Sequence, residues 1–304
     1  MKQHIVKKLV VNTLSLLLLY FAFRKVDILS LLGELAEVPW WFVLFMVVYF
    51  FVIAGLSSVR WCWLVLDKSS WSDYWNFTRA TYLGNYYSLF FPTSLAGDTI
   101  KWLPLLKKYS HLSKTKLLLS VVVDKIVGLS SFVLIGFASL LVGLNQGYAF
   151  PGLLLRLFEG LTLVMFVSWI AFYYFDLEKY LGKYAWLSKV NKVLKIIKDI
   201  NRIQIIKSFF ISLLVVAMWI VPAWFYSQIF DVGISVYEIF IFMPVITLAL
   251  MLPISVAGFG ARENLYLFFL VPLGYPVHKV LLVSTFGGLL GVLNRLLGGL
   301  LMFW

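Results

Sequence analysis

The chain has 304 residues, of which 62% are hydrophobic and only 13% are charged, and its mean hydropathy is +0.93. Soluble domains carry about 45–50% apolar and about 25% charged residues, so this composition excludes an ordinary water-soluble protein. The net charge of +12 fits basic loops that face anionic lipid headgroups, and we expect no binding of nucleic acid.

Metal and disulfide chemistry have little support in the sequence. The single cysteine, Cys62, excludes an internal disulfide and a cysteine-based metal cluster. The three histidines, His4, His111 and His278, lie far apart near the ends of apolar segments. We therefore predict no metal site, no cofactor and no catalytic residue.

Long apolar segments predict the membrane-spanning helices. A helix needs about 20 apolar residues to cross a hydrocarbon core about 30 Å thick. Six segments qualify, at residues 6–23, 40–66, 116–143, 153–175, 206–226 and 278–303. No small-residue cleavage site follows the first segment, so we interpret it as a retained helix. We expect an all-α, polytopic membrane protein, in which residues 1–304 form a single integral-membrane domain.

Two further apolar regions, 79–106 and 236–273, are interrupted by one repeated pattern. The first copy reads Pro-Thr-Ser-Leu-Ala-Gly-Asp-Thr-Ile-Lys from residue 92, and the second reads Pro-Ile-Ser-Val-Ala-Gly-Phe-Gly-Ala-Arg from residue 253. The residues expected to break the helices are Pro92, Ser94, Gly97, Pro253, Ser255, Gly258 and Gly260. Each remaining piece has about a dozen residues or fewer, too short to span a bilayer. The pattern predicts two re-entrant helical hairpins, and the alternative is one kinked span in each place.

Basic residues orient these elements. They concentrate before residue 9, between Lys68 and Lys116, and between Lys179 and Lys207, whereas the connections near 24–39, 144–152 and 227–238 hold few. The positive-inside rule places the basic stretches, and both chain ends, in the cytoplasm. Three spans separate the two hairpins, so they should enter from opposite faces. We expect an inverted repeat with cores at 67–143 and 236–304.

The segment 183–207 links the two repeats. Between Lys189 and Lys207, apolar residues recur at helical spacing, and cations lie mostly on the other side. This pattern predicts an amphipathic helix at the cytoplasmic interface. It could recruit anionic lipid or serve only as a basic connector, and we favour the connector.

Charged residues within apolar stretches are the candidate site. Each costs at least about 2.5 kcal/mol at the centre of a spanning helix, so each should face the protein interior and pair. The candidate substrate-binding residues are Asp98, Lys101, Asp124, Lys125, Arg262, Glu263 and Arg295. Cations with partial carboxylate compensation suit a phosphate headgroup. Ion pairing alone is an alternative role, and for Arg60 we favour a side chain that reaches the interface at the end of its helix.

Three motifs carry a resemblance to a known family. They are the segments 91–101 and 252–263, which contain the two breaks, and Ser-Val-Val-Val-Asp-Lys-Ile-Val-Gly from residue 120. In their order along the chain, at residues 91–101, 120–128 and 252–263, they resemble the lysylphosphatidylglycerol synthase transmembrane-region family, also called flippase-like domain proteins, over nearly the whole chain. Lys101 and Lys125 stand where the family usually has Arg, which retains the charge but not the bidentate fork.

The resemblance implies translocation of a lipid across the cell membrane, either the plasma membrane or an inner membrane. The lipid would be an anionic phospholipid or a polyprenyl-phosphate-linked lipid. Because the synthases of this family use a further soluble domain, we expect this chain to be a transporter and not an enzyme. The alternatives are a membrane-embedded enzyme acting on lipid or polyprenyl phosphates and an accessory subunit of a lipid-modifying complex. A homodimer and a lipid-modifying enzyme partner both stay open.

Overall fold

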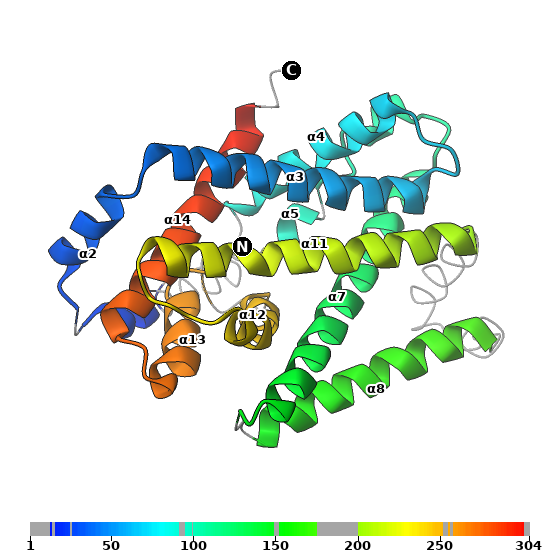
Figure 1. Ribbon diagram of the computed structural model, residues 1–304. Coiled ribbons are helices and arrows are strands. Elements are labelled where there is room, and N and C mark those ends of the chain that lie inside the picture. The colour runs from blue at the N-terminus through cyan, green and yellow to red at the C-terminus, as the bar shows by residue number, and fades with distance from the viewer. Residues whose placement is uncertain are drawn as a thin grey trace. The chain divides into compact units, whose positions relative to one another are not determined.

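The computed structural model describes residues 13, 16–24, 26–90, 95–98, 100–148, 152–174, 200–251, 255 and 258–300. Every regular element among these residues is a helix (Figure 1), which confirms the predicted all-α class. The elements are α2 (Ile28–Ala36), α3 (Trp40–Val65), α4 (Trp71–Ser88), α5 (Leu95–Asp98), α6 (Leu105–Lys108), α7 (Lys114–Asn145), α8 (Gly152–Tyr174), α11 (Arg202–Ile229), α12 (Val236–Leu250), α13 (Ala261–Leu270), the 3-10 turn η2 (Val271–Leu273) and α14 (Val277–Leu300).

Four of these helices, α3, α7, α11 and α14, are long and apolar enough to cross a membrane. They coincide with four of the predicted spans, and the chain is a polytopic membrane protein. The predicted span at 153–175 coincides with α8, which has 23 residues. Of the predicted first span, the part from 16 to 23 is described, and it is helical.

The chain forms two compact units. Unit 1 takes the described residues within Met1–Ala54, Thr81–Lys101 and Met218–Trp304, and unit 2 takes those within Gly55–Ala80 and Trp102–Ala217. The predicted division into repeat cores at 67–143 and 236–304 stays a prediction. So does most of the predicted connector helix, because residues 175–199 lie outside the described part of the chain.

In unit 1, α14 is the helix against which several others pack, and Figure 1 shows it beside α13. Its glycines permit close approach, because a Cβ at Gly287 would lie 2.9 Å from the ring of Tyr226 in α11. A Cβ at Gly298 would lie 2.5 Å from the carbonyl oxygen of Tyr82 in α4. The hydroxyl of Tyr82 also donates to Asn294 over 3.4 Å. These contacts bring the later part of α4 and the later part of α11 against α14.

The second interruption lies between two helices that run antiparallel. In α12, Phe242 stacks on Phe269 of α13 with ring centroids 5.0 Å apart, and the next residue, Met243, accepts a hydrogen bond from Tyr266 over 3.1 Å. A residue later in α12 therefore meets a residue earlier in α13. The chain thus turns back on itself at the break, as a helical hairpin requires, and its re-entry into the membrane stays a prediction.

The first interruption differs from the prediction in length. The helix before it, α4, has 18 residues and begins at Trp71, whereas the apolar pattern placed its start near residue 79. The start is fixed by polar contacts, since the backbone N–H of Asp73 donates to Ser70 Oγ over 3.3 Å and Asp73 accepts from the Ser70 N–H over 2.8 Å. A capping box of this kind starts a helix before its apolar run begins, which is why hydropathy alone missed the first two turns.

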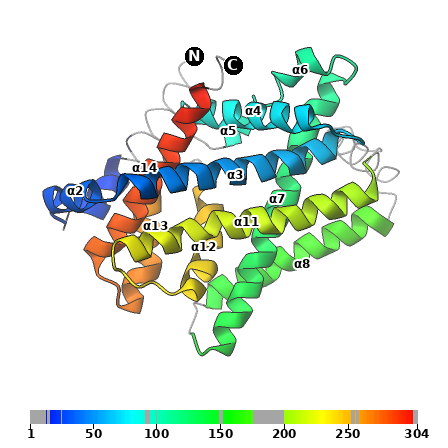
Figure 2. The ribbon, with the colours of Figure 1, turned by 45° about the horizontal axis from the view of Figure 1, so that its top comes forward.

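Unit 2 has an aromatic core beside a pair of long helices. Trp61 and Phe77 pack edge to face with centroids 4.8 Å apart and are fully buried with Leu105 and Leu117 around them. Figure 2 shows α8 beside the later part of α7, and the two helices contact each other. Trp169 of α8 donates to Ser130 of α7 over 3.2 Å. This unit therefore anchors the start of α7, where a predicted site residue, Asp124, lies.

Replacing Gly298 by Ala should destabilise unit 1. The new methyl group would collide with the backbone of Tyr82, which cannot rotate away, and overpacking of this kind costs roughly 1–3 kcal/mol. Gly291 of the same helix is the matched control, because a Cβ there meets no atom within 4 Å. Thermal unfolding in detergent, followed by tryptophan fluorescence, should give a lower midpoint for Gly298→Ala and an unchanged or higher one for Gly291→Ala. Equal midpoints would contradict the close packing of α4 on α14.

A polar contact ties α2 to the start of α14 and should make stability depend on pH. Glu34 lies 2.6 Å from His278 Nε2 and accepts from Lys279 Nζ over 3.0 Å. Hydrogen bonds from His278 and then Lys279 hold the pKa of Glu34 below its usual value of 4.5. A carboxyl with a lowered pKa stabilises the folded state above its unfolded pKa, and this stabilisation is lost as the pH falls through the folded pKa.

Glu34→Gln should therefore lower the unfolding temperature near neutral pH, and the difference from the wild type should shrink and vanish as the pH falls through the lowered pKa of Glu34. Glu37→Gln is the control, because that side chain is exposed at the end of the same helix. A difference that persists unchanged in acid would show that the ionised carboxylate is not what ties α2 to α14.

Candidate functional site

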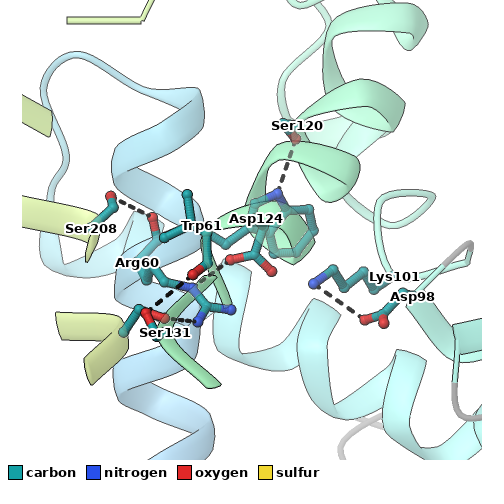
Figure 3. Close-up of polar contacts among 10 residues, drawn as sticks. Arg60, Trp61, Asp98, Lys101, Ser120, Asp124, Ser131 and Ser208 are labelled. Carbon is teal, nitrogen blue, oxygen red and sulfur yellow. Dashed lines mark hydrogen bonds and ion pairs between the residues drawn. The ribbon is translucent and has the colours of Figure 1, made fainter. Parts of the chain in front are cut away.

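A buried ion pair lies in unit 2 where α3, α7 and α11 meet. Arg60 Nε donates to Asp124 over 2.7 Å, and Arg60 Nη1 donates to Ser212 Oγ over 2.9 Å. Figure 3 shows this pair with Ser208, whose hydroxyl donates to the Arg60 carbonyl over 3.4 Å. The expectation that Arg60 reaches the interface is wrong, because its residue is only 7% exposed. The carboxylate of Asp124, on the neighbouring helix α7, holds the Arg60 guanidinium inside the protein.

Two predicted site residues, Asp124 and Lys125, belong to this part of unit 2. Asp124 is 3% exposed and bonded to Arg60, while the side chain of Lys125 is half-buried. Gly128, one turn after Asp124, lies beside the guanidinium, where a Cβ would approach Arg60 Nη1 to 3.3 Å. The contacts of Asp124 are those of a structural ion pair between helices, which was one of the two roles expected for the buried charges.

The first interruption places Asp98 and Lys101 together in unit 1. Their charged atoms are 3.4 Å apart, and Lys101 is only 5% exposed (Figure 3). Gly97 packs against Gly84 of α4 so closely that a Cβ on Gly97 would overlap the Gly84 carbonyl oxygen. The Gly97 position in the repeated pattern is therefore a point of backbone contact. Of the other predicted breaking residues in this copy, Pro92 and Ser94 lie outside the described residues.

In the second interruption, two glycines set the direction in which α13 begins. Gly258 and Gly260 have φ angles of 85° and 79°, in the left-handed region that side chains disfavour. The Gly258 carbonyl accepts from the Arg262 N–H over 2.9 Å, and the Gly260 N–H donates to Glu263 Oε2 over 2.6 Å. Ser255 is buried, and Pro253 lies outside the described residues. This geometry sends the Arg262 side chain toward α14.

The Arg262 guanidinium lies over Gly288 of α14. A Cβ on Gly288 would overlap Arg262 Nη1, and one on Gly258 would lie 3.3 Å from Nη2. Arg262 Nη1 is buried and has no hydrogen-bond partner among the described residues. Arg295 of the same α14 lies near enough to repel Arg262 electrostatically. Two guanidinium groups thus share one region, with the adjacent Glu263 as the carboxylate that interacts with Arg262.

Two hydroxyl groups near this region were not predicted from the sequence. The hydroxyls of Tyr226 and Thr285 are both buried without a hydrogen-bond partner in the described part of the chain. Tyr226 also interacts electrostatically with Arg262. Thr285, Gly288 and Arg295 are spaced three and seven residues apart, so they share one face of α14. That spacing is visible in the sequence, whereas the approach of Tyr226 depends on packing.

The structure therefore divides the seven predicted residues between the units. Asp98, Lys101, Arg262, Glu263 and Arg295 belong to unit 1, and Asp124 and Lys125 belong to unit 2. No group of three or more His, Cys, Asp or Glu side chains placed to hold a metal ion occurs among the residues that the structure describes. The arrangement of Arg262, Arg295 and nearby hydroxyls offers hydrogen-bond donors and positive charge, which are the requirements for binding an anion.

Breaking the Arg60–Asp124 pair should lower the stability of the folded protein. Asp124→Asn leaves a buried guanidinium without its counter-charge, and such changes cost about 3–5 kcal/mol. The double variant Arg60→Met with Asp124→Leu should lose less stability than Asp124→Asn, because it leaves no unpaired charge at this place. Asp67→Asn, at an exposed position, is the control. The measurement is the midpoint of thermal unfolding in detergent for the wild type and the three variants. An Asp124→Asn midpoint equal to that of the wild type would rule out a stabilising pair.

Comparison with known proteins agrees with the helical, membrane-embedded fold. No curated protein and no solved structure matches the chain. The family model described as the lysylphosphatidylglycerol synthase TM region matches residues 5–298, which is nearly the whole chain. The chain, a membrane protein with a function related to membrane lipids, belongs to the lysylphosphatidylglycerol synthase TM-region family.

Proposed function

We propose that this protein is a lipid flippase, which moves a phosphate-bearing headgroup across the membrane while the acyl tails stay in lipid. The observation that carries the proposal is the buried guanidinium of Arg262, whose Nη1 has no hydrogen-bond partner among the described residues. A buried charged donor without an acceptor costs more than a lost hydrogen bond, so this group is suited to a ligand that supplies one. A phosphate oxygen is such an acceptor.

The surroundings of Arg262 support an anionic ligand. Arg295 adds a second positive charge that repels Arg262, and bringing an anion between them would turn that repulsion into attraction. The hydroxyls of Tyr226 and Thr285 are further donors without partners in the described chain. Family membership relates the chain to membrane lipids, so the anion would be the phosphate of an anionic phospholipid or of a polyprenyl-linked lipid.

Contacts at one end of unit 1 support the predicted orientation. Glu34, in the connection near 24–39, contacts the start of α14, and Tyr275 donates to Glu238, in the connection near 227–238, over 2.6 Å. These are connections that the positive-inside rule assigns to one side of the membrane. The proposal therefore keeps both chain ends in the cytoplasm, in a plasma or inner membrane. The hairpin of α12 and α13 would then enter from the opposite side.

Transport, and not catalysis, is the activity we propose. Arg262 and Arg295 supply positive charge, and Tyr226 and Thr285 supply hydroxyl donors. These groups suit the binding of an anion. Alternating access would arise when the phosphate binds the two repeats unequally in their two arrangements. Membrane lipids are the only partners that the proposal requires.

Reconstitution into liposomes tests the proposal. Liposomes that contain fluorescent lipids with several phosphate headgroups are treated with dithionite, which quenches only the outer leaflet. The protein should make inner-leaflet label accessible for at least one headgroup. Accessibility no faster than in empty liposomes, for every headgroup tried, would refute a flippase.

Arg262→Ala should slow translocation. A hydrogen bond to a charged group contributes about 1.5–3 kcal/mol, which corresponds to a roughly 10- to 100-fold slower rate if it is made in the transition state. Arg156→Ala is the matched control, because Arg156 is an exposed arginine of α8. The same dithionite assay, on proteins with equal thermal midpoints, measures both. If the two variants scramble lipid at the wild-type rate, Arg262 does not hold the headgroup.

A further inference from the structure

Glu263 has one carboxylate oxygen that its structural role does not explain. The residue is fully buried, with 0% exposure, at the start of α13. Its Oε2 accepts from the Gly260 N–H over 2.6 Å, which satisfies the first turn of the helix. Its Oε1 is buried and has no hydrogen-bond partner among the described residues. Capping therefore accounts for one oxygen of the carboxyl group and leaves the other unused.

Glu238 shows how a glutamate at the same kind of position behaves without this feature. It occupies the third position of α12, and its Oε2 accepts from the Ser235 N–H over 3.0 Å and from the Tyr275 hydroxyl over 2.6 Å. No oxygen of Glu238 is among the buried atoms without a partner in the described residues. The two glutamates thus share the capping contact and differ in the surroundings of the remaining oxygen.

The charged and titratable groups around Glu263 decide whether its carboxyl group carries a proton. Arg262 attracts the carboxylate, and Arg262 in turn repels Arg295 of α14. The groups that face this region are Arg262 and Tyr266 on α13, Arg295 on α14 and Tyr226 on α11. Those farther along the packed elements are Tyr237 and Glu238 on α12, His278 and Lys279 at the start of α14, and Tyr20 and Arg24 on residues 16–24. On α4, which packs on α14, and on the first interruption, which packs on α4, they are Tyr82, Tyr86, Asp98 and Lys101. Glu263 is the carboxyl group that follows Arg262 directly in the chain and interacts with it electrostatically.

We propose that Glu263 binds a proton together with the lipid phosphate, so that one proton enters the site when the headgroup binds Arg262 and Arg295 and leaves when it departs. The inference rests on the proposed function, and it adds a proton as the coupled ion. An anion at Arg262 would repel an ionised Glu263, because the two side chains belong to adjacent residues. The protonated carboxyl group would instead donate from Oε1 to a phosphate oxygen, which satisfies both groups. The proton comes from water on one side and returns to water on the other.

Linkage makes this proposal measurable. If the bound phosphate favours the protonated carboxyl group, then a lower pH must favour phosphate binding by the same factor. Over the pH window in which only the lipid-bound state is protonated, the apparent affinity should fall up to about tenfold for each unit of rising pH. Outside that window, the affinity should be flat.

Isothermal titration calorimetry of the full chain in detergent, with dihexanoyl phosphatidylglycerol as the probe, tests the proposal between about pH 5 and pH 8. Titrations in buffers of different ionisation enthalpy give the protons taken up per bound lipid. The wild type should take up as much as one proton, and Glu263→Gln, which keeps an oxygen for the Gly260 N–H, should bind with no exchange at every pH. Glu238→Gln is the matched control and should behave as the wild type.

Each outcome decides between the two proposals. Wild-type binding with no proton uptake, at an affinity independent of pH, overturns the role of Glu263 and leaves the flippase proposal intact. Proton uptake that survives in Glu263→Gln also overturns it. If Glu263→Gln fails to fold, the wild-type and Glu238→Gln titrations still decide whether a proton is coupled. Absence of lipid binding by the wild type, together with no translocation in liposomes, refutes the proposed function and this inference with it.

Discussion

Positive charge held inside an apolar helical protein is the interaction on which this structure depends. A guanidinium group removed from water must find a counter-charge or a full set of acceptors, since its desolvation costs several kcal/mol. The chain meets this requirement at Arg60, where Asp124 lies 2.7 Å away and Ser212 accepts a second hydrogen bond. Three helices converge on that group, so the pair fixes how α3, α7 and α11 meet within unit 2.

Arg262 is the contrasting case. It lies on Gly288, beside a repelling arginine, and its Nη1 lacks a hydrogen-bond partner among the described residues. The same physical cost that makes Arg60 a structural residue makes Arg262 a candidate for ligand binding. The difference between them comes from what surrounds each side chain, because both are arginines in apolar segments. Stability and function are thus separated by the partners of otherwise similar charges.

Glycine makes both arrangements possible. Gly258 and Gly260 allow the left-handed turn that starts α13, and Gly288 leaves the space that the Arg262 side chain fills. Gly97 and Gly84 bring the first interruption against α4 in the same way. In a medium where lipid is as apolar as the side chains, close backbone contact of this kind contributes much of the attraction between helices. The glycines therefore determine which charged groups can approach which helix.

The sequence by itself determined the class of the protein and the positions of its long helices. Hydropathy is a local property, so segments of about 20 apolar residues predicted α3, α7, α11 and α14. The second copy of the repeated pattern likewise predicted the break between α12 and α13, whereas Gly97 of the first copy lies within the short helix α5. The motifs predicted the family. Hydropathy did not predict the early start of α4, because a polar capping box fixes that end of the helix. Tertiary structure decided the partners: Arg60 pairs across helices with Asp124, and Tyr226 of α11 approaches Arg262. Contacts between residues far apart in the chain depend on packing, which no local pattern encodes.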